Sequence, residues 1–265
     1  QQGRTMPTAQ VNGIKLHYET QGSGTPLVFI HGLGSCLEDW EHQLAYFSKR
    51  YRVITVDLRG HGRSDKPTAG YSMQLFASDI AMLCNALRLE PAHIVGISLG
   101  GGIAFQLAVD SPEVVRTLTI VNSAPEVFFK TLKEKFAIWM RFAIINTMGL
   151  QKLGGILAEK LFPRPQDEAE KRKFLERYQR NEAKPYKASL RAFIGWSVMN
   201  QIGNLRMPTL IMAADQDYTP ISLKEEYTPK IPGAKLVVIP NSHHAAPMET
   251  PETFNALLDE FLAAH

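Results

Sequence analysis

The chain has 265 residues, of which 45% are hydrophobic and 21% are charged, and its formal net charge is +3. This composition is typical of a globular protein with a large apolar core and argues against a disordered chain. The run nearest to a membrane span, residues 137–145, is interrupted by Arg141, so we expect no membrane span. Basic residues are not interleaved with aromatic ones, which argues against nucleic-acid binding.

The cysteine content and the first ten residues further limit the class of protein to which the chain can belong. Cys36 and Cys84 are the only cysteines, and no CxxC pair is present. They indicate neither a disulfide framework nor a metal site. Residues 1–10 are polar and lack the apolar stretch of a secretory signal, so we expect a cytoplasmic protein.

The charge is unevenly distributed along the chain. Residues 124–200 hold 15 Lys and Arg against 8 Asp and Glu, a balance of +7, while the rest of the chain has a balance of −4. Such a shift in composition between neighbouring segments suggests a separate structural unit.

Apolar strand patterns and helical spacings alternate along residues 11–121. From this alternation we predict an α/β fold with a doubly wound, mostly parallel sheet. We expect a strand or a hairpin over 11–20, strands over 27–30, 52–56, 94–96 and 114–121, and helices over 37–51, 72–89 and 99–109. Ser72 is the expected N-cap of the second helix.

The alternation stops near residue 124 and resumes at Pro208. There we expect strands over 209–213 and 235–239 and helices over 222–230 and 250–264. Within the intervening segment we expect helices over 127–150, 166–180 and 186–200. We therefore predict an α/β core of residues 1–123 and 206–265, and a helical cap of residues 124–205 over the carboxyl edge of the sheet, where open α/β folds bind ligands.

The apolar band of the first cap helix is wider than one buried stripe requires. We expect it to line an apolar substrate pocket, with Phe136, Trp139 and Phe142 as candidate substrate-binding residues. Arg141 and Arg191 are the basic cap residues that could instead meet an anionic substrate.

The segment from Gly96 to Gly100 has the form Gly-x-Ser-x-Gly, with a β-branched run before it and a helix former after it. A strand, a sharp turn and a helix would present the hydroxyl of Ser98 at the apex. The two glycines would stand where a Cβ would collide with neighbouring backbone. Ser98 is therefore the candidate nucleophile.

A serine nucleophile needs a base, an acid that orients the base, and donors for the oxyanion. His243 and His244 both follow the strand at 235–239, and only one of two adjacent loop residues is expected to reach Ser98. Asp215 and Asp217 follow the strand at 209–213, and one of them would orient the imidazole.

The oxyanion donors would be backbone N–H groups. A Gly-rich loop, His31 to Gly34, follows the strand at 27–30 and could aim the N–H of Leu33 inward. The N–H of Leu99 lies at a helix N-terminus directly after Ser98. Together they would form a two-donor oxyanion hole.

The order Ser98, Asp217, His244 resembles the α/β-hydrolase superfamily. The resemblance runs from about residue 11 to the C-terminus, apart from the cap. The matching motifs are His31-Gly32-Leu33-Gly34 with Trp40 downstream, Asp57-Leu58-Arg59-Gly60-His61-Gly62-Arg63-Ser64-Asp65, Gly96-Ile97-Ser98-Leu99-Gly100-Gly101, and His244-Ala245-Ala246-Pro247-Met248-Glu249-Thr250-Pro251-Glu252.

The resemblance implies which of the duplicated candidates act. The family's His-x4-Glu spacing selects His244 over His243, and its acid pattern favours Asp217 over Asp215. Ser98 at the turn excludes the relatives that need Asp there, haloalkane dehalogenases and soluble epoxide hydrolases. The Ser98-Leu99-Gly100 segment departs from the pattern of plant hormone receptors on this scaffold.

These observations predict a carboxylesterase that acts on a small-molecule ester without metal or organic cofactor. The apolar cap favours an uncharged ester. The alternatives are a lactonase or enol-lactonase, and a hydrolase of carbon–carbon bonds in ring-cleavage products. A non-catalytic ligand receptor on the same scaffold is the alternative outside enzymes.

Overall fold

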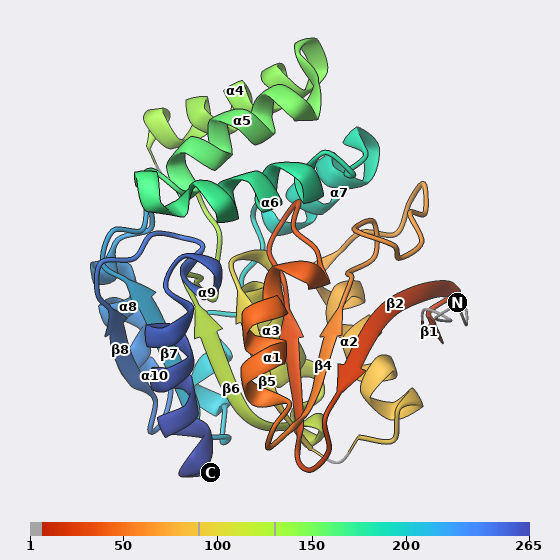
Figure 1. The fold of residues 1–265 in the computed structure, drawn as a ribbon, viewed down its shortest axis with the longest axis vertical. Helices are drawn as coiled ribbons and strands as arrows, with labels where there is room; N and C mark the ends of the chain where they lie inside the picture. The colour runs from red at the N-terminus through yellow and green to blue at the C-terminus, as the bar shows by residue number, and fades with distance from the viewer. Residues whose placement is uncertain (1–6, 90, 130) are drawn as a thin grey trace.

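The computed structural model describes residues 7–89, 91–129 and 131–265, and its centre is an eight-stranded sheet (Figure 1). The strand order is β1-β2-β4-β3-β5-β6-β7-β8. The first two pairings, β1 with β2 and β2 with β4, are antiparallel, and the others are parallel, which confirms the predicted fold class. The strands are β1 (Thr8–Val11), β2 (Ile14–Gln21), β3 (Pro26–Ile30), β4 (Arg52–Val56), β5 (Ala92–Ile97), β6 (Val115–Val121), β7 (Thr209–Ala214) and β8 (Lys235–Ile239).

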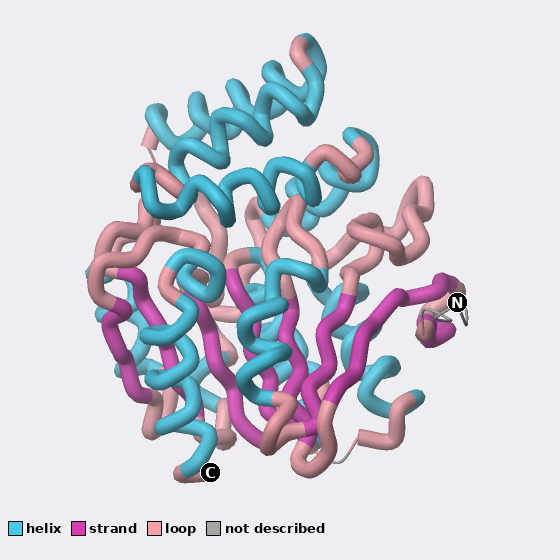
Figure 2. Tube along the Cα trace, in the orientation of Figure 1, coloured by secondary structure: helices cyan, strands magenta, loops and turns pink. Residues whose placement is uncertain are grey.

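Helices cover both faces of the sheet, as Figure 2 shows. The two faces have separate apolar cores, one with side chains from α2, α3 and α8 and one with side chains from α1 and α10. Because both faces are covered, β3 and β7 are buried along their whole length. The core helices are α1 (Glu41–Phe47), α2 (Met73–Ala86), α3 (Leu99–Asp110), α8 (Ile221–Tyr227), α9 (Ala246–Glu249) and α10 (Pro251–Ala263).

The predicted elements of the core exist, and the differences there lie at helix ends. Of the strand or hairpin expected over 11–20, the structure forms the hairpin, because Asn12 and Gly13 have φ values of 42° and 76° that turn the chain between β1 and β2. Ser72 is confirmed as the N-cap of α2, since its side chain accepts a hydrogen bond from the N–H of Leu75 at 3.1 Å.

Between β6 and β7 the described residues form four α-helices, and in Figure 1 these stand above the arrowheads of the parallel strands. They are α4 (Leu132–Thr147), α5 (Gly149–Leu161), α6 (Glu168–Tyr178) and α7 (Ala183–Phe193). The single helix expected over 127–150 is wrong. α4 begins directly after its N-cap Thr131, which forms a capping box with Glu134 in the first turn, and α5 begins at Gly149, whose φ of 81° interrupts the helical path. We call α4–α7 the cap.

The cap contacts the core through ion pairs as well as apolar side chains. Arg177 of α6 pairs with Asp39 at 2.9 Å, and Lys173 pairs with Glu41 at 2.8 Å. Arg180 pairs with Glu38 at 2.6 Å. Much of the excess positive charge of residues 124–200 therefore faces acidic residues of the core. None of the helices in the described ranges combines the length and the hydropathy that crossing a bilayer requires.

Three core histidines are buried, and burial dominates the titration of each. It lowers the pKa of His31 to about 4, of His61 to about 3 and of His93 to about 4. In an unfolded chain these imidazoles take up protons near pH 6.5. Below that pH the unfolded state binds more protons than the folded state, so stability is full above pH 6.5 and is lost as pH falls toward 4.

Replacing His93 by Gln should weaken this pH dependence. Gln keeps a polar partner for Thr117, whose hydroxyl lies 2.8 Å from Nδ1 of His93, but it does not titrate. Urea unfolding of both proteins at pH 7 and pH 4.5 should show that the variant loses about 2 kcal/mol less than wild type. Equal losses of unfolding free energy in the two proteins would contradict the conclusion that His93 stays neutral in the folded state.

Candidate active site

Ser98 lies at the sharp turn between β5 and α3. Its backbone has φ 54° and ψ −118°, a conformation that L-residues rarely adopt. A Cβ on Gly96 would overlap the carbonyl of Gly100, and one on Gly100 would overlap the carbonyl of Ile30. The glycines of the Gly-x-Ser-x-Gly pattern are thus required by close backbone contacts, as the sequence predicts.

The loop after β3 lies beside this turn. An ideal Cβ on Gly32 would stand 3.4 Å from Cβ of Ser98 and 3.9 Å from its Oγ. Leu33 therefore follows a residue in contact with Ser98, and Leu99 is the first residue of α3, where N–H groups have no intrahelical acceptor. This arrangement brings the two predicted oxyanion donors to one place in the fold, and their role stays a prediction.

The imidazole of His31 holds this loop. Its Nδ1 lies 2.7 Å from the carbonyl oxygen of Gly32, and its Nε2 lies 3.1 Å from the N–H of Leu58. The carbonyl requires a donor and the N–H requires an acceptor, so His31 is neutral with its proton on Nδ1. The low pKa of His31 that burial causes agrees with this tautomer.

His244 and Asp217 are in direct contact. Nδ1 of His244 lies 2.8 Å from Oδ1 of Asp217. Burial alone would raise the pKa of Asp217, but the charge and hydrogen bond of His244, helped by Thr219 and Lys224, hold it below its usual value. Asp217 is therefore a carboxylate at neutral pH, able to orient and stabilise a protonated imidazole.

The other member of each candidate pair has different partners. Asp215 accepts hydrogen bonds from the N–H groups of Asn241 and Ser242, both at 3.0 Å. Nδ1 of His243 lies 2.6 Å from Oε1 of the buried Glu249. Asp215 and His243 thus shape the loop that carries His244, whereas Asp217 contacts the His244 ring itself.

Two residues near Asp217 were not predicted. Lys224 is fully buried, with Nζ 3.4 Å from Oδ2 of Asp217 and 2.6 Å from the carbonyl of Thr219. Burial lowers the pKa of Lys224, and the neighbouring carboxylate opposes that shift. In the sequence it is an ordinary lysine in a short helix, so no local signal identifies it.

Tyr218 is the second unpredicted residue and lies against the imidazole of His244. Its ring stacks on the imidazole of His244 with centroids 4.3 Å apart. The residue is 60% accessible. Desolvation, followed by the charge of Asp217, raises the pKa of Tyr218, while the charge of Arg141 and the side chain of Ser98 act the other way. Tyr218 is therefore an accessible residue that packs on His244 and whose hydroxyl is influenced by both Ser98 and Arg141.

The amide of Asn122 joins three loops at this edge of the sheet. Its Nδ2 donates to the carbonyl of His244 at 3.0 Å, and its Oδ1 accepts from the N–H of Ala214 at 2.8 Å. Asn122 has φ 45°, a conformation that asparagine tolerates better than most residues. It fixes the end of β6 to the end of β7 and to the loop of His244.

The predicted substrate-binding residues on α4 do not share one environment. Phe136 and Trp139 stack on each other and are 60% and 61% accessible. Arg141 contacts Tyr186, and around the helix axis it is separated from Phe136 by about 140° and from Trp139 by about 160°. The two aromatic rings thus lie on the side of α4 away from Arg141. A pocket-lining role for them stays a prediction that their accessibility does not favour.

Phe142 faces the interior of the cap. It packs against the apolar cluster that includes Tyr178, Tyr186 and Met248. The guanidinium of the exposed Arg191 lies 5.2 Å from the centroid of the Phe142 ring. Of the three predicted residues, Phe142 is the one packed beside the loop of His244, and its contact with substrate stays a prediction.

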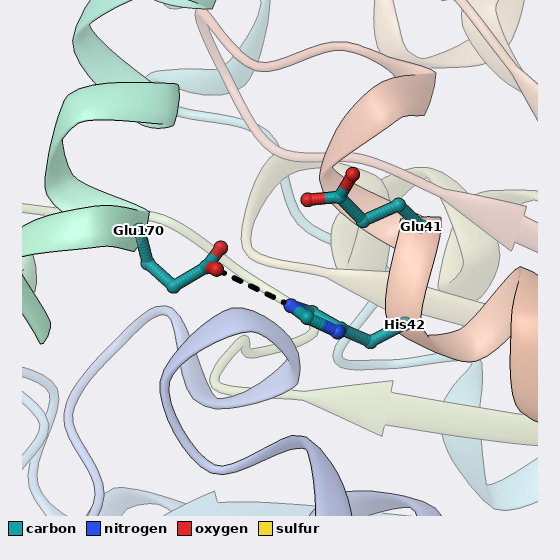
Figure 3. Close-up of side chains that lie close together, drawn as sticks. All are labelled: Glu41, His42 and Glu170. Carbon is teal, nitrogen blue, oxygen red and sulfur yellow. Dashed lines mark ion pairs between the residues drawn. The ribbon is translucent and has the colours of Figure 1, made fainter.

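One cluster in the described ranges could hold a metal ion by its geometry, formed by Glu41, His42 and Glu170 (Figure 3). Nε2 of His42 lies 3.4 Å from Glu170. Nζ of Lys173 lies 2.8 Å from a carboxylate oxygen of each glutamate. A cleft of about 390 Å³ beside it is lined by paired charges that include Glu38 and Arg177. Lys173 already supplies the cation for these carboxylates.

Comparison with known proteins places this geometry in a family. The model of the alpha/beta hydrolase fold matches residues 25–251. The "Putative carbamate hydrolase RutD" of Azorhizobium caulinodans is 29% identical over 262 residues, which cover 96% of this chain and 97% of that protein.

Two solved structures share the fold over nearly the whole chain. Est816, described as an N-acyl homoserine lactone degrading enzyme, is 30% identical with a TM-score of 0.81, covering 96% of this chain and all of that one. The esterase EaEST from Exiguobacterium antarcticum is 25% identical with a TM-score of 0.90, covering 97% and 98%. Because the family model spans most of the sequence, this chain belongs to the alpha/beta hydrolase fold family, and it is a hydrolase.

Proposed function

We propose that the protein is a serine hydrolase that cleaves carboxylic esters through an acyl-enzyme. The observation that carries the proposal is the strained turn that presents Ser98 beside Gly32. The hydrogen-bonded pair of His244 and Asp217 supports it by supplying an oriented base. A conformation of this cost persists only where its surroundings enforce it, and such strain gathers at active sites.

In the proposed mechanism His244 accepts the proton of Ser98 as its Oγ attacks the ester carbonyl. Nδ1 of His244 faces Asp217, which leaves Nε2 for this transfer. The N–H groups of Leu33 and Leu99 stabilise the tetrahedral oxyanion. His244 then protonates the leaving alcohol, and afterwards it activates the water that hydrolyses the acyl-enzyme.

Lactones are cyclic esters, so the same steps would open them, and the similarity to Est816 supports a lactone as the second candidate substrate. The similarity to RutD raises a carbamate, which has the same electrophilic carbonyl. Hydrolysis of a carbon–carbon bond is the third candidate reaction. Side-by-side assays with p-nitrophenyl esters, lactones, carbamates and dienones separate these functions by which substrate is turned over.

Replacing Ser98 by Ala should remove the nucleophile and leave the fold intact. We expect kcat for ester hydrolysis to fall by roughly 10³- to 10⁶-fold. Thermal unfolding of the purified variant checks that it is folded. Ester hydrolysis near the wild-type rate would refute the assignment of Ser98.

The duplicated candidates form matched pairs. His244→Ala should lower kcat nearly as far as Ser98→Ala, and Asp217→Asn should follow it, because both remove the base or its orientation. His243→Ala and Asp215→Asn change neighbouring residues that contact Glu249 and backbone N–H groups, so their kcat should fall far less. The reverse order within either pair would overturn the assignment.

Lys224→Met should change the pH profile rather than only the rate. Without the ammonium group Asp217 faces one positive charge fewer, so a protonated imidazole beside it becomes more favourable. We expect the acidic limb of the kcat/KM profile to move to higher pH by roughly half a unit to one unit. Lys230→Met, which alters a half-exposed lysine of the same region, is the control and should leave the profile in place. An unchanged profile in both variants would leave Lys224 with a purely structural role.

A further inference from the structure

Arg141 is a partly buried cation without an acidic partner. Its Nε donates to the hydroxyl of Tyr186 at 3.1 Å, its Nη2 donates to the same oxygen, and its guanidinium lies 5.5 Å from the centroid of that ring. Among the residues that the structure describes, no carboxylate lies within ion-pair distance of Arg141. Arginines this far from bulk water are usually paired, so this guanidinium calls for an explanation.

Arg141 stands close to the candidate active site. The rings of Tyr178 and Tyr186 pack on Gly34, the residue after Leu33, where an ideal Cβ would lie 2.6 Å and 2.8 Å from them. The positive charge of Arg141 also acts on Tyr218, which stacks on His244. Arg141 is thus one tyrosine away from the predicted oxyanion loop, and its charge reaches the tyrosine that stacks on His244.

The groups around Arg141 offer donors in excess of acceptors. Tyr178 is 1% exposed, and its hydroxyl lies beside the side chains of Tyr186 and Arg141 without a hydrogen bond of ordinary geometry. The oxygen of Tyr186 already accepts from Arg141, so its own O–H is available to donate. A guanidinium has five N–H donors and no acceptor, so one guanidinium and two phenols together hold more donors than acceptors. Buried polar groups in folded proteins are nearly always satisfied, so this excess of donors points to a ligand that supplies acceptors.

From this geometry we infer that Arg141, with the hydroxyls of Tyr178 and Tyr186, binds a carboxylate on the substrate, remote from the bond that is cleaved. The inference rests on the proposed function for the identity of that bond. A single guanidinium with phenol donors suits a planar monoanion, since arginine matches carboxylate geometry and a phosphate dianion would call for more positive charge. The apolar residues of the cap, judged from the sequence alone, favour an uncharged ester. In the structure, however, two of them, Phe136 and Trp139, lie on the side of α4 opposite to Arg141.

Two chromogenic esters with the same acyl chain test the inference. Mono-p-nitrophenyl glutarate ends in a carboxylate, and its methyl ester does not. Wild-type protein should hydrolyse the carboxylate form with a kcat/KM about 10- to 100-fold higher, the value of a charge-assisted hydrogen-bonded contact. The matching succinate and adipate pairs vary the spacing, and a preference in at least one of the three pairs is expected. Preference for the methyl ester in all three would overturn the proposal.

Variants then assign the preference to Arg141. Arg141→Gln should abolish it, mainly by raising KM for the carboxylate form, and Arg141→Lys should retain part of it. Arg191→Gln is the matched control, because Arg191 is a cap arginine over an aromatic ring but is exposed. It should keep the full preference. A preference that survives in a folded Arg141→Gln protein would contradict the assignment.

A binding measurement separates this inference from the proposed function. Ser98→Ala protein should bind monomethyl glutarate at least tenfold more tightly than dimethyl glutarate by calorimetry, and Arg141→Gln in the same background should remove the difference. If wild-type protein hydrolyses no ester while this difference stands, the ester function fails and the carboxylate site holds. If esters are hydrolysed but neither measurement distinguishes the charged forms, the carboxylate site fails and the ester function holds.

Discussion

The backbone contact between the Ser98 turn and the end of β3 is the constraint from which the candidate site follows. Because Gly96 and Gly100 carry no Cβ, α3 can begin against the carbonyl of Ile30, and the loop after β3 then lies beside Ser98. Neighbouring strands hold the turn: the N–H of Ser98 donates to Val121 at 3.0 Å, and its carbonyl accepts from Ser123 at 2.7 Å. A methyl group at either glycine would separate the nucleophile from its predicted oxyanion donors.

The cap is attached by a different kind of interaction from those that hold the core. Its helices share their own apolar cluster, which reaches the core through Ala245 and Met248, next to His244. Around that contact the attachment is ionic, and Arg164 links the cap to the buried Glu249 at 3.0 Å. Glu249 also binds His243, so a cap arginine and the loop of His244 share one carboxylate. The position of the cap and the geometry of the base are thereby joined.

Much of this fold could be predicted because its signals are local. Contiguous apolar runs mark the strands buried on both faces, and Ser72 and the Gly-x-Ser-x-Gly turn mark helix starts. The inner side of α4 could not be predicted, because that helix is apolar nearly all round and its orientation is set by Tyr186, which lies 45 positions from Arg141. Lys224 and Tyr218 were missed for a related reason: their significance comes from Asp217 and His244 folding against them, and neither belongs to a recognisable pattern.

The three tryptophans of the chain differ in their exposure to solvent, and this difference separates the fluorescence of the cap from that of the rest of the molecule. Trp40 and Trp196 are 1% and 6% exposed, and Trp196 donates from its indole nitrogen to Gln106 of α3 at 2.7 Å. Trp139 alone is accessible, on the cap, at 61%. A collisional quencher added to the native protein therefore meets one indole and is screened from the other two. The quenchable part of the emission comes from Trp139 and can follow movement of the cap, while the emission of Trp40 and Trp196 stays unquenched.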